Sequence, residues 1–464
     1  MERMDRTDDS GVQGRNGYDE ERIQEELCDM KENGLLTEPL PRLFWRYVLP
    51  AMAAMVLDGI QGIVDGLFLG NFVGADAMAS VNIANPYFQV IIGGSMIICT
   101  GTMSAVGRAL GAGDGKRAKD IYHSALLVLL GLSLAILMAG VLGAAPLARF
   151  LGANEVLLEG SEQYIHTLAF FAPVIAFKIL FGFSGRLVGK PQLYLAGTIT
   201  TISANIILDY VTVGLMGLGV RGAAFATGLA YLAGLLVVAG PMFRKETVLN
   251  VYDGRFRSGE ILYAAFNGSS EGVTYAAAAL TVFLMNRSFM AYAGESGVAA
   301  FTIINYVGNF VTLLMFGMSD GISPILSNNY GAGNKERIQK TLRAALIANF
   351  LLGLALFGIF WIWGRNLISL FLDGDQGEQV ISLAVRGAKI YGLCFLANGF
   401  NIVQSGYHTA LGDAVSSILI AASRGIVFVP IGLALFSRIL GIDGVWVSLP
   451  FAEVVTVGVC FWIG

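Results

Sequence analysis

Long apolar runs dominate this sequence and limit what it can fold into. From Leu43 onward, each run is long enough to cross a bilayer as a helix. Hydrophobic residues make up 55% of the 464 residues and charged residues only 14%, against about 25% in an ordinary soluble domain. The sequence therefore predicts an all-α membrane protein with twelve transmembrane helices. Their approximate limits are 43–70, 77–106, 120–143, 163–187, 192–216, 222–243, 259–290, 297–327, 340–363, 380–407, 413–436 and 444–464.

The connections between these runs alternate in positive charge, which predicts the orientation. Lysine and arginine concentrate after the second, fourth, sixth and eighth runs, whereas the intervening connections carry one arginine or none. Because cytoplasmic loops of membrane proteins are rich in lysine and arginine, we expect both termini on the cytoplasmic side of the plasma membrane. The charged connections contain Arg108, Lys116, Arg117 and Lys119; Arg186 and Lys190; Arg244, Lys245, Arg255 and Arg257; and Lys335, Arg337 and Lys340.

Residues 1–41 form a polar, acidic tail before the first run. The tail has twelve acidic and five basic residues, a net charge of −7, and lacks the apolar segment of a cleavable signal peptide. Such a composition favours a solvated, disordered arm, which the predicted topology places in the cytoplasm.

The rest of the chain repeats itself at an offset of about 220 residues. The segment 111–114, Gly-Ala-Gly-Asp, returns as Gly-Ala-Gly-Asn at 331–334, each followed three residues later by an arginine. At the same offset Asn85 corresponds to Asn305, and Gly74 to Gly294. A duplication with six spans per half predicts two lobes of shared topology, related by a pseudo-twofold axis along the membrane normal. We place the N-lobe at 42–245, a cytoplasmic linker at 246–256 and the C-lobe at 257–464.

Asn205 and Asp209 lie inside the fifth run, four residues apart, so a helix brings their side chains to one face. A carboxylate at that depth costs at least ~2.5 kcal/mol and needs a partner, a proton, an ion or water. Two oxygen-bearing side chains on one face suit a small cation or a proton. The alternative is that Asp209 caps a helix end near the membrane interface.

Several of these features together resemble the multidrug and toxic compound extrusion (MATE) family. The resemblance covers residues 43–464 and rests on the duplicated halves, the Gly-Ala-Gly loops, Pro50 with Val64 and Asp65 in the first span, the 205–209 segment, and Gly-Ala-Ala at 222–224. It implies a V-shaped pair of six-helix lobes around a central cavity that opens alternately to each side. It also implies cation-driven export of bulky, often cationic, amphipathic compounds.

The resemblance assigns a cation or proton site to four residues of the N-lobe: Asp65, Asn205, Asp209 and Thr227. Two carboxylates that share one site do not both stay ionised without a cation, so one takes up a proton or both bind Na⁺. The alternative is that the two aspartates cap separate structures. Pro50 lies inside the first span, where a proline bends a helix, and is predicted to act as a hinge.

The C-lobe departs from one branch of the family. Glu271 in the seventh span resembles an acidic residue of that branch, but Asn398, Asn401 and Gln404 occupy the region of its span-10 aspartate. The resemblance therefore does not carry a C-lobe sodium site over. Arg424 and Glu453 both lie deep in apolar sequence, where a glutamate and an arginine usually pair.

Two roles stay open for Glu271: a structural ion pair with Arg424, or a carboxylate that faces the transported compound. Further candidates for the substrate cavity are Asp58, two helical turns before Asp65, and the polar residues Asn305 and Gln404. Asp320 and Lys178 also lie within spans, either as members of local ion pairs or with side chains extended to the interface.

The sequence thus predicts an ion-coupled antiporter, driven by H⁺ or Na⁺, that exports drugs or metabolites as a monomer by alternating access. The alternative within the same superfamily is a flippase for a lipid-linked oligosaccharide, whose phosphates require a cavity lined by arginine and lysine. An intramembrane enzyme is disfavoured, because no nucleophile, histidine pair or metal cluster converges in the sequence. We expect no cofactor, no metal apart from Na⁺ at the cation site, and no nucleic-acid partner.

Overall fold

The structure, a computed structural model, describes residues 34–369 and 377–464. The first half of the chain forms long helices joined by short turns. These elements are α2 (Gly34–Thr37), α3 (Leu40–Phe72), α4 (Ala75–Gly111), α5 (Gly115–Phe150), α6 (Leu158–Ala169), α7 (Ala172–Leu187), α8 (Pro191–Asp209), the π-helix η1 (Tyr210–Leu215), α9 (Gly219–Ala239) and the 3₁₀-helix η2 (Gly240–Phe243).

The second half begins with α10 (Ser258–Gly331), in which the backbone is helical on both sides of Gly294. At that glycine φ is 61° and ψ is −149°, so α10 consists of two helices, 258–293 and 295–331. The remaining elements are α11 (Lys335–Ser369), α12 (Gly377–Tyr391), α13 (Cys394–Leu411), α14 (Ala414–Ala422), the π-helix η3 (Ser423–Val427), α15 (Phe428–Leu440) and α16 (Ile442–Ile463).

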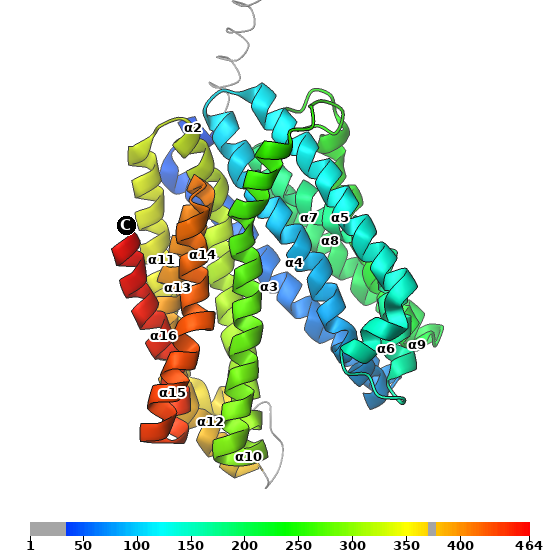
Figure 1. Cartoon of the computed structure of the whole chain (residues 1–464), viewed down its shortest axis with the longest axis vertical. Coiled ribbons are helices and arrows are strands. Elements are labelled where there is room, and N and C mark those ends of the chain that lie inside the picture. The colour runs from blue at the N-terminus through cyan, green and yellow to red at the C-terminus, as the bar shows by residue number, and fades with distance from the viewer. Residues whose placement is uncertain (1–33, 370–376) are drawn as a thin grey trace, which may run out of the picture.

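The described helices account for the twelve predicted spans. Nine helical stretches are long and apolar enough to cross a membrane, and two bent pairs, α6 with α7 and α12 with α13, bring the number to eleven. Counting α10 as two helices gives twelve. In Figure 1 these helices form two groups that meet near the 244–257 connection and diverge toward the opposite end. The predicted all-α architecture of two six-helix lobes is confirmed.

The sequence repeat reappears in the backbone as paired turn glycines. Four pairs, at offsets of 220 to 223 residues, have positive φ values, a conformation that favours glycine. The side chain that follows the Gly-Ala-Gly turn caps the next helix in both lobes. Asp114 accepts a hydrogen bond from the Arg117 amide at 2.9 Å, and Asn334 accepts one from the Arg337 amide at 3.2 Å. The glycine pairs are Gly74 and Gly294, Gly113 and Gly333, Gly189 and Gly412, and Gly219 and Gly441.

The lobes meet through a reciprocal contact of α4 with the second helix of α10. A Cβ atom added at Gly111 would lie 1.9 Å from the Asn328 carbonyl oxygen, and one added at Gly331 would lie 2.0 Å from the Arg108 carbonyl oxygen. Residues 108 and 328, like 111 and 331, are related by the 220-residue offset. The interface is therefore self-complementary, as a twofold arrangement requires. Glycine allows this close approach of helix backbones.

Cross-lobe hydrogen bonds between described residues cluster at the same end, which we call the linker end. Ser104 of α4 donates to the Thr409 carbonyl of α13 at 2.6 Å. Arg117 at the start of α5 forms a bidentate ion pair with Glu260 at the start of α10, with donor–acceptor distances of 2.9 and 3.1 Å. The structure is therefore closed at the linker end.

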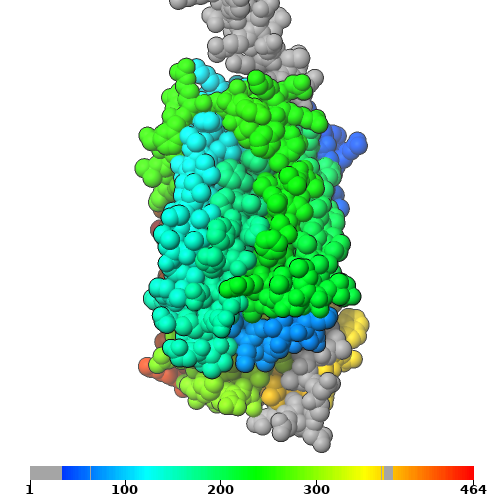
Figure 2. Space-filling view, turned by 90° about the vertical axis from the view of Figure 1, so that its right-hand side faces the viewer, coloured from blue at the N-terminus to red at the C-terminus, as the bar shows by residue number. Residues whose placement is uncertain are grey.

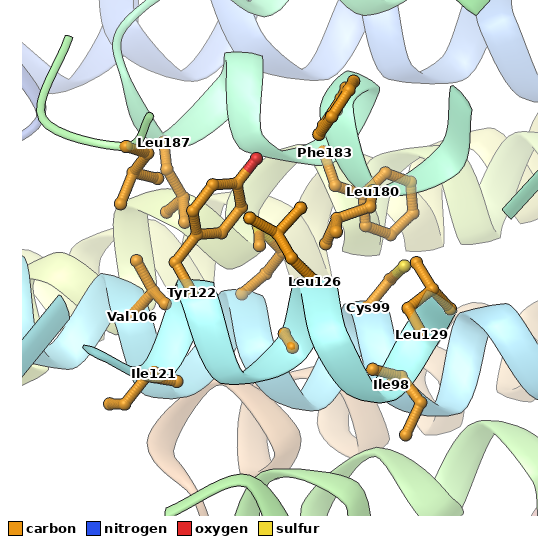
Figure 3. Packing of buried hydrophobic residues seen from close by; sticks show 14 of the residues in the cluster. Ile98, Cys99, Val106, Ile121, Tyr122, Leu126, Leu129, Leu180, Phe183 and Leu187 are labelled. Carbon is orange, nitrogen blue, oxygen red and sulfur yellow. The ribbon is translucent and has the colours of Figure 1, made fainter. Parts of the chain in front are cut away.

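Each lobe has an apolar core of its own. Figure 3 shows part of the N-lobe core, where Tyr122 and Leu126 of α5 pack against Leu180 and Phe183 of α7. The outer face of α5 is apolar as well, with Leu142 75% exposed. That helix runs along the side of the molecule seen in Figure 2. Apolar side chains on both the inner and outer faces are what a lipid environment requires.

The expected acidic arm covers residues 1–41, of which 1–33 lie outside the described residues. The remainder is not a solvated arm. Leu35 in α2 is 1% exposed, and Arg337 of α11 donates to the Leu35 and Glu38 carbonyls at 3.2 and 2.9 Å. Because Leu35 is buried and Arg337 binds these two carbonyl oxygens, the segment packs on the C-lobe. The helix α3 begins at Leu40, before the start of the predicted first span.

Candidate cation-binding site

Two helices of the N-lobe bring the predicted acidic residues together. Asp65 lies on α3, and Asn205 and Asp209 lie on α8, which packs against α3. The Asn205 amide donates to Asp209 Oδ2 at 3.2 Å, and the side chains of both residues interact with the Asp65 carboxyl group. Asn205 is 0% and Asp209 1% exposed, so both are buried within the lobe, and Asp65 is partly buried.

Three oxygen atoms of this site lack a hydrogen-bond partner among the described residues: Asp65 Oδ1, Asn205 Oδ1 and Asp209 Oδ1. Buried polar atoms are normally satisfied, because an unpaired one costs about 1–3 kcal/mol. A proton shared between the carboxyl groups would supply a donor. A hard cation such as Na⁺ would instead bind the oxygen atoms directly. The donor set fits either ion.

The backbone around the site is irregular. The α-helix α8 ends at Asp209, and the chain continues as the π-helix η1. The Thr212 hydroxyl lies 2.8 Å from the Leu208 carbonyl oxygen and 3.0 Å from that of Gly222, which ties this irregular turn to α9. π-helical turns are often found at functional sites, so the position of this turn directly after Asp209 is consistent with a functional site here.

Thr227, the fourth predicted member, is not joined to the carboxylates by a recorded hydrogen bond. It lies on α9, 3% exposed, and its hydroxyl donates to the Ala223 carbonyl at 3.0 Å. Sequence reasoning also missed Tyr164 of α6, which lies within electrostatic range of Asp65 and Asp209. Nothing in the sequence distinguishes this tyrosine from the other aromatic residues of the spans.

Asp58 is joined to a second buried cluster in the N-lobe. It lies within electrostatic range of Lys178 on α7, and its Oδ1 atom has no hydrogen-bond partner among the described residues. Lys178 is 3% exposed, its Nζ atom lies 5.2 Å from the centre of the Tyr231 ring, and Thr198 accepts its hydrogen bond at 3.5 Å. Lys178 is therefore buried in the lobe, and its side chain does not extend to the membrane interface.

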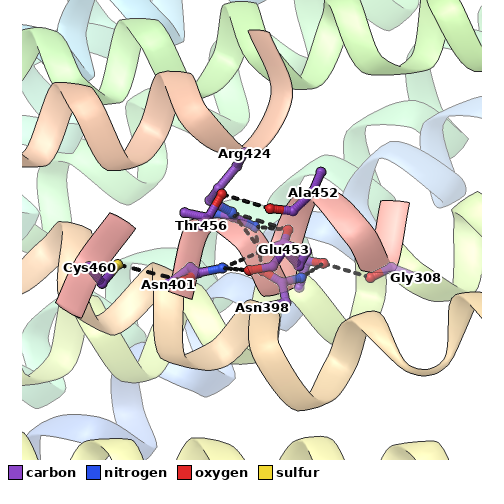
Figure 4. A network of polar contacts seen from close by, with 9 residues as sticks. Gly308, Asn398, Asn401, Arg424, Ala452, Glu453, Thr456 and Cys460 are labelled. Atoms are coloured by element: carbon purple, nitrogen blue, oxygen red, sulfur yellow. Dashed lines mark hydrogen bonds and ion pairs between the residues drawn. The ribbon is translucent and has the colours of Figure 1, made fainter. Parts of the chain in front are cut away.

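Of the two roles left open for Glu271, the structure contradicts the ion pair with Arg424. Arg424 binds Glu453 of α16, with Nη2 2.9 Å from Oε1 and Nε 3.1 Å from both carboxylate oxygens. Figure 4 shows this network, in which Arg424 also donates to Asn398, and Asn401 donates to Glu453 Oε2 at 2.7 Å. η3 packs against both α10, which carries Glu271, and α16, which carries Glu453, and the Arg424 side chain meets Glu453. Glu271 is on α10, within electrostatic range of Asp320.

The two lobes therefore differ in how they handle buried charge. In the C-lobe Arg424 and Asn401 satisfy the Glu453 carboxylate, and Asn398 accepts a hydrogen bond from Arg424. In the N-lobe no recorded ion pair among the described residues involves Asp65 or Asp209. The Glu453 charge is therefore balanced within the C-lobe, whereas the two N-lobe carboxyl groups have no such partner among the described residues.

The other candidates remain predictions. Asn305 lies on the second helix of α10 and Gln404 on α13, and both are partly buried. Pro50 lies inside α3, which runs unbroken from Leu40 to Phe72.

The Arg424 and Glu453 pair should be strongly coupled. We expect Arg424→Met and Glu453→Gln each to lower the thermal stability of the detergent-solubilised protein, because each leaves a buried partner unsatisfied. The double variant should be less destabilised than the sum, with a coupling on the order of 1–3 kcal/mol. Unfolding curves of the four proteins measure this coupling, and strict additivity would contradict it.

This architecture defines a polytopic membrane transporter with two homologous lobes. The chain belongs to the MatE family, whose model matches residues 50–211 and 273–433, one block in each lobe. The multidrug export protein MepA of Staphylococcus aureus (strain bovine RF122 / ET3-1) is 25% identical over 419 residues, covering 89% of this chain and 91% of MepA. MepA of Staphylococcus saprophyticus is 23% identical over 411 residues, covering 88% of this chain and 90% of that protein.

Solved structures share the fold. One, described as the outward-facing conformation of a multidrug resistance MATE family transporter of the MOP superfamily, superposes with a TM-score of 0.86 at 23% identity. Another is a MOP superfamily transporter from Pyrococcus furiosus Vc1 (DSM3638), described as having a binding pocket of reverse polarity, with a TM-score of 0.86 at 22% identity. Each comparison covers 93% of this chain and 97% of the other.

Proposed function

We propose that this protein is a secondary active antiporter that uses a gradient of H⁺ or Na⁺ to export amphipathic, often cationic compounds. It acts in the plasma membrane as a monomer, with its linker end in the cytoplasm, and catalyses no chemical reaction. The observation that supports the proposal most directly is the buried Asp65 and Asp209 pair, for which the structure records no protein cation among its described residues.

Ion occupancy of this pair provides the coupling. Two adjacent carboxylates repel each other when both are charged, so an ion from the outside binds between them and neutralises their charge. Loss of the ion to the cytoplasm restores negative charge, which attracts a cationic compound. Transport against a gradient requires only that the ion and the compound prefer different facing states of the lobes.

The relatives support the choice of cargo. MepA is named as a multidrug export protein, which favours small amphipathic compounds for this chain also. The flippase alternative requires a basic cavity for phosphates. Acidic groups instead lie partly buried along α3 and α10: Asp58, Glu271 and Asp320.

The test is transport of ethidium by purified protein in liposomes, with a pH gradient and a sodium gradient imposed separately. We expect at least one gradient to drive ethidium against its concentration difference, and the effective gradient identifies the coupling ion. Failure of both gradients would overturn the proposal. Gradient-independent movement of a fluorescent lipid-linked oligosaccharide would favour the flippase.

A further inference from the structure

Arg186 and Asp320 form an ion pair between the lobes. Arg186 lies near the end of α7 in the N-lobe, and Asp320 lies on the second helix of α10 in the C-lobe. Arg186 Nη1 is 3.7 Å from Asp320 Oδ2 and donates to the Asp320 backbone oxygen at 3.3 Å. The sequence predicts Arg186 to be a residue of a cytoplasmic connection, but its side chain is 4% exposed.

The N-lobe holds the arginine firmly. Its guanidinium carbon lies 4.0 Å from the centre of the Phe183 ring and 4.8 Å from that of Tyr194. Its backbone carbonyl accepts a hydrogen bond from Tyr47 at 3.0 Å. A guanidinium stacked on aromatic rings keeps its place through these contacts, so it moves with the N-lobe when the lobes separate.

The aspartate is bound more loosely. A distance of 3.7 Å is too long for a hydrogen bond, and Asp320 Oδ2 has no hydrogen-bond partner among the described residues. A well-formed pair of arginine and carboxylate would have donor–acceptor distances of about 2.7–2.9 Å. A small cavity of about 20 Å³, large enough for one water molecule, adjoins both side chains.

Other charged groups surround this pair. Glu271 lies within electrostatic range of Asp320. In the N-lobe, Asp58 and Lys178 lie within electrostatic range of each other, and both lie near Tyr194. When the lobes separate at the linker end, Glu271 and Asp320 stay with the C-lobe and Arg186 leaves with the N-lobe. The C-lobe then carries two carboxylates without their cation, a site that attracts an organic cation.

We propose that Asp320 exchanges the guanidinium of Arg186 for the cationic group of the transported compound, and that Arg186 displaces this compound when the linker end closes. The inference rests on the proposed function and specifies its cargo: amphipathic cations with an ammonium or quaternary nitrogen. Arg186 acts as a tethered competitor that prevents the closed linker end from retaining the cation. The same pairing stabilises the closed linker end, so closure and release are coupled.

The test is equilibrium binding to the detergent-solubilised full chain. Ethidium is the cationic probe, and the uncharged amphipath N-phenyl-1-naphthylamine is the comparator. We expect Arg186→Met to bind ethidium about tenfold more tightly, because its competitor is gone, and Asp320→Asn to bind it about tenfold more weakly. Arg186→Lys, which retains the charge, should stay closer to wild type than Arg186→Met. Binding of the neutral probe should not change in any of these variants.

Two controls sharpen the result. Arg221→Met removes an exposed arginine of the same lobe and should leave ethidium binding unchanged. In the Arg186→Met and Asp320→Asn double variant the tightening should vanish. Unchanged or weaker ethidium binding by Arg186→Met, with the neutral probe still bound, would overturn the inference. Because this assay needs no gradient, that outcome is distinct from failure of gradient-driven transport in wild-type liposomes, which would overturn the proposed function instead.

Discussion

Replacing Asp209 or Asp65 by asparagine should abolish gradient-driven ethidium export while leaving the protein folded and inserted. An amide is less costly in a membrane than a carboxylate, so insertion should not suffer. The amide cannot take up a proton, and it replaces an anionic ligand of Na⁺. Ion occupancy would then no longer change the relative energy of the two facing states, so an ion gradient could not drive transport. Export in liposomes should fall to the rate of protein-free liposomes.

A matched control is available in the same lobe. Asp76, exposed in the first turn of α4, loses its charge in Asp76→Asn without touching the buried site, and this variant should export at the wild-type rate. Size-exclusion profiles and ethidium binding in detergent would confirm that the Asp65 and Asp209 variants are folded. If Asp209→Asn exported at the wild-type rate under the same gradient, the coupling site would lie elsewhere, and Glu271 with Asp320 would be the next place to examine.

The architecture could be predicted because its determinants are local or periodic. Each span is recognised from its own length and hydropathy, and the duplication from matched turns such as 111–114 and 331–334. The meeting of Asp65 with Asn205 and Asp209 was predicted by resemblance to a family. The helical spacing explains only the pair four residues apart.

The side-chain pairings depend on packing between distant helices, which the sequence does not encode locally. Arg424 could pair with Glu271 or with Glu453, because η3 packs against both α10 and α16, and only the side-chain geometry of the folded chain selects Glu453. Arg186 lies at the predicted end of its span and reads as a residue of a positively charged connection, yet its side chain is buried against the other lobe. No periodicity in the sequence indicates that its partner is Asp320, 134 residues away.

The close approach of the two lobes leaves no room for a side chain at Gly111 or Gly331. Adding one methyl group, in Gly111→Ala or Gly331→Ala, should block closure of the linker end. The new Cβ atom would lie 1.9 or 2.0 Å from a backbone carbonyl oxygen of the other lobe, so the lobes must move apart. Alanine favours a helix over glycine by about 1 kcal/mol, so loss of helix stability does not explain a defect. Overpacking of ~1–3 kcal/mol would shift the population of the closed state by about 5- to 150-fold.

Spin-label distances measure this shift directly. In a background without native cysteines, labels at Lys116 and Lys335 report the linker end, and labels at Asn71 and Glu295 report the opposite end; all four positions are exposed. The first distance should lengthen in Gly111→Ala and the second should shorten, with a matching loss of ethidium export. Gly131→Ala on α5, where an added Cβ meets nothing within 4 Å, should change neither. Wild-type distances and export in both interlobe variants would show that transport does not require these backbones to touch, and the reciprocal glycine contact would then be packing without a role in the cycle.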